Sequence, residues 1–136
     1  MPSPPGVLVV DDNPDVLTLL DAVLQRAGFC VWSAPDGPAG ARAFLEYRAE
    51  IDVVLLDVQM PGWDGPRTLQ AVRAVDATVP CCFMSGDTGR HTRDALLGLG
   101  ATAVFPKPFD ITTLAESLRE LAARSASRRG ASHTEA

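Results

Sequence analysis

The stretch that decides the fold is VLVVDDNPDVLTLLDAVLQRAG, residues 7–28. Its first four residues are apolar, mostly β-branched and too few for a buried helix, so they predict a strand covered on both faces. Asn13 and Pro14 then match a helix N-cap followed by proline at the first helical position. Apolar residues recur at helical spacing before Gly28 ends the helix, namely Val16, Leu19, Leu20, Val23 and Leu24.

The same alternation of a short apolar run with a helical segment occurs about five times along the chain. Further strands are predicted at residues 29–33, 53–56, 81–84 and 103–105. Helices are predicted at about 39–47, from about Pro66, up to Gly98 or Gly100, and after the capping residue Asp110. Strands that alternate with helices require right-handed crossovers, so we expect a three-layer α/β sandwich with a parallel sheet.

The two ends of the chain differ from this pattern. Residues 1–5 and 125–136 are polar or proline-rich without an apolar period, and we expect them to be disordered around a domain at 6–124. From Arg124 onward the chain holds three arginines and one glutamate, a net charge of +2, so the remainder carries −7. A docking or localisation role is the alternative interpretation of this basic tail.

Composition restricts the partners and the compartment. The net charge of −5 over 136 residues argues against direct DNA binding and against binding an anionic membrane. No apolar run approaches the roughly 18 residues that span a bilayer, and no secretory peptide opens the chain. Three cysteines, an odd number, suit a reducing compartment, so a cytoplasmic location is expected.

Chemically useful side chains follow four of the predicted strands: Asp11 and Asp12, Asp57, Ser85, and Lys107. In an open parallel sheet, ligands bind beyond the carboxyl ends of the strands. Three carboxylates at one edge repel one another unless a cation joins them, and an oxygen-only site suits Mg²⁺ better than zinc. The alternative for each aspartate is a helix cap or a solvated loop.

Lys107 is the one lysine among the twelve basic residues. Its compact ammonium suits a phosphoryl oxygen, although a surface lysine that falls there by chance is the alternative. Ser85 could donate its hydroxyl to the same group, and Gly86 leaves space for it. A carboxylate attacks phosphorus once cations neutralise the phosphoryl oxygens, which makes Asp57 the best nucleophile candidate.

Three motifs together resemble the receiver domain of two-component response regulators: LVVDDNP at 8–14, LLDVQMPGWDG at 55–65 and FPKPF at 105–109. The resemblance covers Val7 to about Arg124. It implies a flavodoxin-like fold with five strands in the order 2-1-3-4-5 and five helices.

The resemblance also implies roles for single residues. Asp57 corresponds to the phosphoacceptor and to a metal ligand; Asp12 to a direct Mg²⁺ ligand and Asp11 to one through water. The backbone carbonyl of Gln59 corresponds to a further ligand, and Ser85 and Lys107 to the groups that bind the phosphoryl oxygens. Gly86, Gln59 and Asp87 would flank the phosphoryl group, and Lys107–Pro108 would be a cis peptide.

One position departs from the family pattern. The Tyr or Phe usually found three residues before the lysine, whose rotamer follows that of Ser85, is here Val104. Phe105 cannot replace it, because successive side chains of a strand point to opposite faces.

The resemblance implies a bacterial phosphoacceptor rather than an enzyme, with intrinsic self-phosphorylation and self-dephosphorylation. Its phosphodonor would be a histidine kinase or a histidine phosphotransfer protein in a phosphorelay. Because no output domain fits after Arg124, we expect a stand-alone receiver, monomeric or dimerising on phosphorylation, that acts on an unknown protein target or as a phosphate shuttle. A fragment of a longer protein is the alternative. The alternatives are a pseudo-receiver scaffold that needs no phosphorylation and an aspartyl-phosphate phosphatase of the haloacid dehalogenase type.

Overall fold

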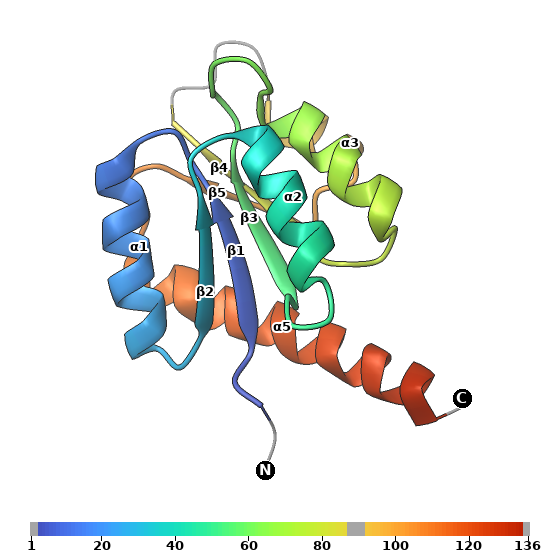
Figure 1. Cartoon of the computed structure of the whole chain (residues 1–136). Coiled ribbons are helices and arrows are strands. Elements are labelled where there is room, and N and C mark those ends of the chain that lie inside the picture. Colours follow the sequence, from blue (N-terminus) through green and yellow to red (C-terminus); the bar gives the residue numbers. More distant parts are fainter. Residues whose placement is uncertain (1–2, 87–91, 135–136) are drawn as a thin grey trace.

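The computed structural model describes residues 3–86 and 92–134. Within them, five strands alternate with five helices, as predicted. The elements are β1 (Gly6–Val10), α1 (Pro14–Arg26), β2 (Cys30–Ala34), α2 (Gly37–Tyr47), β3 (Val53–Asp57), α3 (Gly65–Val75), β4 (Cys81–Ser85), α4 (Arg93–Gly98), β5 (Ala103–Pro106) and α5 (Ile111–Thr134). All strands run parallel in the order β2-β1-β3-β4-β5 (Figure 1), which confirms the predicted flavodoxin-like sheet.

Two apolar cores hold the three layers together. One core joins the sheet to α2, α3 and α4 through side chains such as Phe44, Leu69 and Leu96. The other joins it to α1 and α5 through Leu20 and Leu118. Every residue of β1, β3 and β4 is buried, because helices cover both faces of these strands.

Each helix after a strand begins on a side-chain cap. Asn13 Oδ1 accepts a hydrogen bond from the Asp15 amide at 2.9 Å, with Pro14 at the first helical position, as predicted. The predicted cap at Asp110 accepts from the Thr112 amide at 2.9 Å. Asp36, Asp64 and Thr92 cap α2, α3 and α4 in the same way. These caps begin each helix close to the carboxyl end of the strand that precedes it.

Several boundaries differ by one or two residues from those predicted, and two of them have a clear local cause. β2 begins at Cys30 rather than Phe29, because the Phe29 amide still donates to the carbonyl of Leu24 in the turn after α1. α2 begins at Gly37 rather than near Ala39, because Asp36 caps it. In both cases a local hydrogen bond decides the boundary, not the apolar pattern.

The last helix is longer than expected. α5 continues to Thr134, so residues 125–134 are helical where the sequence predicted a disordered tail. An established helix extends one residue at a time, and no proline stops this one, although Gly130 is a poor helix former. At the amino-terminal end, where residues 1–5 were expected to be disordered, the carbonyl of Pro5 accepts a hydrogen bond from the Cys30 amide at 2.9 Å.

Two of the three cysteines lie in the cores. Cys81 and Cys82 belong to opposite cores, and burial raises the pKa of each thiol to about 12, so both pack as small apolar residues. Cys30 is exposed on β2, and all three are free. Among the residues described, no helix has the length and apolar character needed to cross a membrane.

Candidate functional site

Three carboxylates meet where β1 and β3 end. Val10 of β1 pairs with Leu56 of β3, so the residues that follow them, Asp11 and Asp57, lie side by side. One carboxylate oxygen from each of Asp11, Asp12 and Asp57 lies within 4.8 Å of the other two. Asp11 is fully buried, Asp57 is 7% exposed and Asp12 is exposed. This cluster is open to solvent on the side of Asp12.

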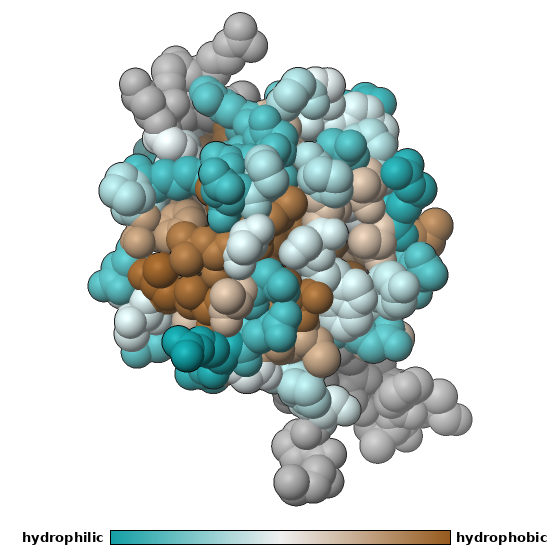
Figure 2. Space-filling model, turned by 60° about the vertical axis from the view of Figure 1, so that its left-hand side comes forward, coloured by the Kyte–Doolittle hydropathy of each residue, from teal (hydrophilic) through white to brown (hydrophobic). Residues whose placement is uncertain are grey.

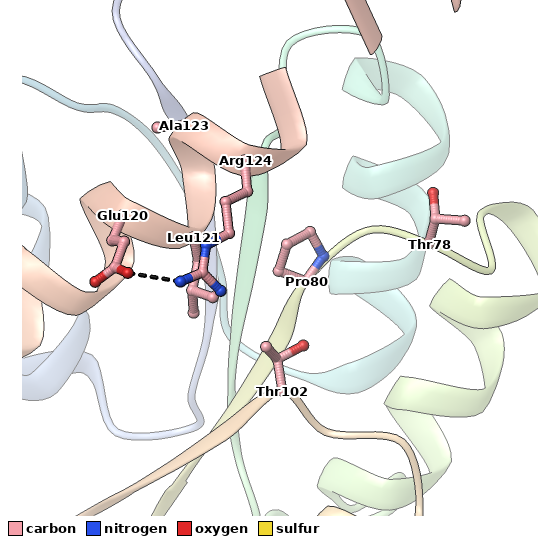
Figure 3. A pocket seen from close by; sticks show the side chains of 7 residues that line it. All are labelled: Thr78, Pro80, Thr102, Glu120, Leu121, Ala123 and Arg124. Atoms are coloured by element: carbon pink, nitrogen blue, oxygen red, sulfur yellow. Dashed lines mark hydrogen bonds and ion pairs between the residues drawn. The ribbon is translucent and has the colours of Figure 1, made fainter. Parts of the chain in front are cut away.

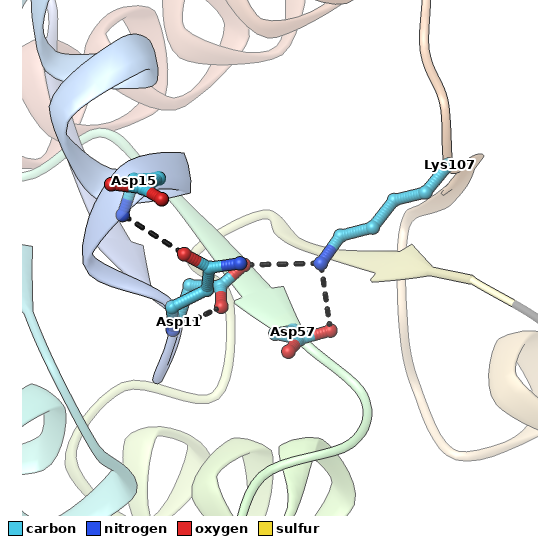
Figure 4. Close-up of polar contacts among 5 residues, drawn as sticks. Asp11, Asp15, Asp57 and Lys107 are labelled. Atoms are coloured by element: carbon cyan, nitrogen blue, oxygen red, sulfur yellow. Dashed lines mark hydrogen bonds and ion pairs between the residues drawn. The ribbon is translucent and has the colours of Figure 1, made fainter.

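Lys107 directly follows the edge strand β5, and its side chain extends towards this cluster (Figure 4). Its Nζ lies 3.1 Å from Asp11 Oδ2 and 3.3 Å from Asp57 Oδ1. The Lys107 amide donates to the carbonyl of Ser85 at 2.7 Å, which fixes the backbone from which the long side chain extends. The Lys107–Pro108 peptide is cis, as the resemblance implied.

The second oxygen of Asp11 is also held. Asp11 Oδ1 accepts from the Asn13 amide at 2.9 Å, so one oxygen faces the start of α1 and the other faces Lys107. Sequence reasoning identified Asn13 only as a helix cap and missed this contact. The signal was its place two residues after Asp11, the spacing at which an aspartate accepts from the chain that follows it.

The electrostatics of the site oppose full ionisation of Asp57. Burial, and then the negative charge of Asp11, raise the pKa of Asp57 to about 6, against the opposing charge of Lys107. Burial alone would lower the pKa of Lys107, but the charges of Asp57 and Asp11 outweigh it and raise that pKa. Lys107 therefore stays protonated, and the negative charge left in the cluster favours a further cation.

The remaining predicted residues lie at the same edge. Ser85 ends β4 and is buried, and its neighbour in the register is Pro106, directly before Lys107. Gln59 and Gly86 are exposed, and a Cβ added to Gly86 would meet no atom within 4 Å. This leaves open space beside Ser85. Asp87 lies outside the described residues.

Val104 and Phe105 occupy opposite faces of β5. Val104 is 9% exposed and packs in the core with α2, α3 and α4, whereas Phe105 packs against the core with α1 and α5. Phe105 therefore does not replace the missing aromatic residue at position 104, as predicted from the strand alternation.

A groove on the described surface lies away from the carboxylates. It has a volume of about 800 Å³ and is lined by Thr78, Pro80, Thr102, Glu120, Leu121, Ala123 and Arg124 (Figure 3). Pro80 and Thr102 precede β4 and β5, so this groove lies at the amino ends of the strands. Two of these lining residues, Arg124 and Glu120, form an ion pair with a nitrogen–oxygen distance of 2.6 Å.

A family model and curated relatives indicate the same family for this chain. A family model for the response regulator receiver domain matches residues 7–119. The transcriptional regulatory protein PrrA of Mycobacterium bovis is 39% identical over 120 residues, which cover 88% of this chain and 51% of PrrA. The chain spans about half the length of the first curated relatives that it matches.

Solved structures agree with the fold. The chemotaxis protein CheY4 of Vibrio cholerae matches with a TM-score of 0.78 and 29% identity, covering 86% of this chain and 98% of CheY4. A response regulator receiver domain protein of Clostridium thermocellum matches with a TM-score of 0.84 and 24% identity, covering 90% and 97% of the two chains.

These relatives correct one prediction. The expectation of no direct DNA binding is wrong, because the matching curated relatives are transcriptional regulatory proteins. The argument from a net charge of −5 described only the surface of this chain. It says nothing of the remaining length of such a relative.

Proposed function

Because this chain belongs to the response regulator receiver domain family, we propose that Asp57 accepts a phosphoryl group from a histidine kinase or a histidine phosphotransfer protein. One observation carries the proposal. The Lys107 ammonium lies within 3.3 Å of the Asp57 carboxylate and 3.1 Å of the Asp11 carboxylate, at the carboxyl edge of a parallel sheet. This is the place where an incoming phosphoryl group finds both a nucleophile and a positive charge.

The reaction is a displacement at phosphorus. An Asp57 carboxylate oxygen attacks, the oxygen–phosphorus bond forms, and the bond from phosphorus to the donor's imidazole nitrogen breaks, with its electron pair left on that nitrogen. Lys107 Nζ faces the attacking group and neutralises charge on the phosphoryl oxygens. The protein contributes position and charge rather than a further covalent step.

The carboxylate cluster fits Mg²⁺. Asp11, Asp12 and Asp57 supply hard oxygen donors within 4.8 Å of one another, and the exposed Asp12 leaves room for water on the ion. The Gln59 carbonyl, two residues after Asp57, is the further donor in this proposal. A bound Mg²⁺ would offset the charge of the phosphoryl oxygens and of Asp57.

Ser85, Gly86 and Gln59 are assigned to the surroundings of the phosphoryl group. The Ser85 hydroxyl donates to a phosphoryl oxygen from the end of β4, and the open space beside Gly86 admits that group. We assign to Gln59 and to Asp87 a role beside the path by which water attacks the acyl phosphate. Both therefore influence how long the acyl phosphate lasts.

A protein phosphodonor also needs a surface on which to dock. α1 begins three residues after Asp11, and its Leu19 is 48% exposed. Figure 2 shows apolar surface among polar surface on the side of the molecule where α1 and β2 lie. Exposed apolar surface on this side of the molecule suits contact with a helix that carries a phosphohistidine.

The test is intact mass spectrometry after incubation with acetyl phosphate or phosphoramidate, with and without Mg²⁺. The wild type should gain one phosphoryl group in a Mg²⁺-dependent reaction, and Asp57→Asn should gain none. Asp15→Asn is the matched control, because Asp15 lies beside the cluster but outside it. A phosphoryl gain in Asp57→Asn, or none in the wild type with either donor, would contradict the proposal.

A further inference from the structure

A tryptophan and an arginine are stacked on the surface where α3 begins. Trp63 lies in the loop between β3 and α3, and the guanidinium carbon of Arg67 stands 4.8 Å from the centroid of the Trp63 ring. A cation over the face of an indole is attracted by the ring quadrupole. The arginine head group is thereby held in one place.

The tryptophan itself is fixed from the other side. A Cβ added to Gly37, the first residue of α2, would lie 2.6 Å from Trp63 Cβ and 3.1 Å from Trp63 Cε3. The loop therefore packs against α2 at a distance that only glycine permits. Trp63 is a rigid support for Arg67, so little entropy is lost when Arg67 binds a partner.

The donors of Arg67 are open to a partner. Its side chain is exposed and makes no hydrogen bond or ion pair with any residue that the structure describes. Trp63, Arg67, Gln70 and Ala71 line a depression of about 230 Å³. Arg67, Gln70 and Ala71 are spaced three and four residues apart, so they share one face of α3. Sites for small molecules are usually larger, and this depression suits a single side chain.

We propose that this α3 surface, Trp63, Arg67, Gln70 and Ala71, is a docking site for a carboxylate side chain of a partner protein. The guanidinium presents a fork of donors that matches a carboxylate, and the Gln70 amide adds a further donor. Trp63 and Ala71 supply apolar contact around the charge, and no acidic residue lines the depression. Tryptophan and arginine are also the residue types that most often dominate binding energy at protein interfaces.

This surface shares no residue with the carboxylate cluster. Docking at the α3 surface can therefore be tested separately from phosphoryl transfer to Asp57.

The test uses the full chain in a Trp32→Phe background, which leaves Trp63 as its one tryptophan. The probe is a short helical peptide of alanine, leucine and glutamate, compared with the same peptide carrying glutamine for glutamate. Binding is followed by Trp63 fluorescence and by the NMR signals of Arg67 Nε–H and the Gln70 side-chain amide. The glutamate peptide should move all three signals, and the glutamine peptide should bind about tenfold more weakly.

The variants locate the contact. Arg67→Ala should raise the Kd for the glutamate peptide about tenfold, while thermal unfolding shows that the variant stays folded. Arg42→Ala removes an exposed arginine of α2 that does not line the depression, and its Kd should equal that of the parent protein. Equal binding of the two peptides, an unchanged Kd in Arg67→Ala, or no binding at millimolar peptide would overturn the proposal.

Discussion

Gly65 lies against Asp57 so closely that a Cβ carbon at position 65 would stand 2.6 Å from the Asp57 carbonyl oxygen. The same Cβ would lie 2.9 Å from Val58 Cα and 2.9 Å from the Phe83 ring. The Gly65 amide donates to the Val58 carbonyl at 2.9 Å. The first residue of α3 therefore sets the backbone position of Asp57.

Gly65→Ala should displace the end of β3 and destabilise the protein by about 1–3 kcal/mol, because two of the crowded atoms are backbone atoms. Denaturant unfolding measures the cost, and the rate of phosphoryl gain from phosphoramidate should fall with it. Gly98→Ala is the matched control, since its Cβ would meet nothing within 4 Å in a helix and should leave stability unchanged or slightly raised. Equal stability of the two variants would contradict the crowding.

Asp57 should make stability fall as pH rises. Its folded pKa of about 6 exceeds the ordinary value of 3.8, so between these two pH values the folded protein binds more protons than the unfolded chain. Metal-free Asp57→Asn lacks this loss and should be more stable than the wild type at pH 8, by about 1–3 kcal/mol. Denaturant unfolding in the presence of a chelator should show that the difference in unfolding free energy between the two proteins shrinks towards pH 4.

Asp76→Asn provides a contrast of opposite sign. Burial would raise the pKa of Asp76, but hydrogen bonds from Thr78 outweigh burial and lower it. This carboxylate stabilises the fold above its unfolded pKa, and that contribution is lost as pH falls through the folded pKa. Asp76→Asn should therefore be less stable than the wild type at pH 8. If Asp57→Asn and Asp76→Asn changed the stability at pH 8 in the same direction, the pKa directions assigned to the two carboxyl groups would be contradicted.

Mg²⁺ should stabilise the folded chain, because the assembled carboxylate cluster exists only in the folded state. Asp12→Asn removes one donor and should weaken Mg²⁺ binding about ten- to a hundredfold, measured by calorimetry or by the dependence of Tm on Mg²⁺. Asp15→Asn removes an equal charge from the first turn of α1 and should change the affinity little. A similar loss in both variants would indicate general charge attraction instead of coordination.

Position 104 should not accept an aromatic ring without cost. Val104 pairs with Phe83 of β4 and is buried against the core with α2, α3 and α4. Val104→Tyr should cost about 1–3 kcal/mol through overpacking, and Val104→Ile, which adds one methylene, should cost less. Denaturant unfolding of both variants measures these two costs. A tyrosine variant as stable as the wild type would show that a ring has space on this face of β5.

Most of the fold could be predicted because its signals are local. β1 and α1 are marked by an apolar run, an Asn-Pro start and a glycine end, and both appear where expected. The start of β2 and the end of α5 could not be placed, because a hydrogen bond from Phe29 to Leu24 and the continuation of an established helix carry no apolar signal. The exclusion of DNA as a partner was wrong for another reason, since the net charge of this chain does not describe the full length of the transcriptional regulators that it matches.

The sequence by itself determined which side chains stand at the ends of the strands, because each strand and each helix start is encoded within a few residues. Parallel strands then bring Asp11, Asp57 and Lys107 to one edge, whatever the details of packing. Only the tertiary structure decided that Lys107 contacts both carboxylates, that Gly65 presses on Asp57 and that Arg67 covers Trp63. Those relationships depend on distances of a few ångströms between separate elements, which close packing sets and no local pattern records.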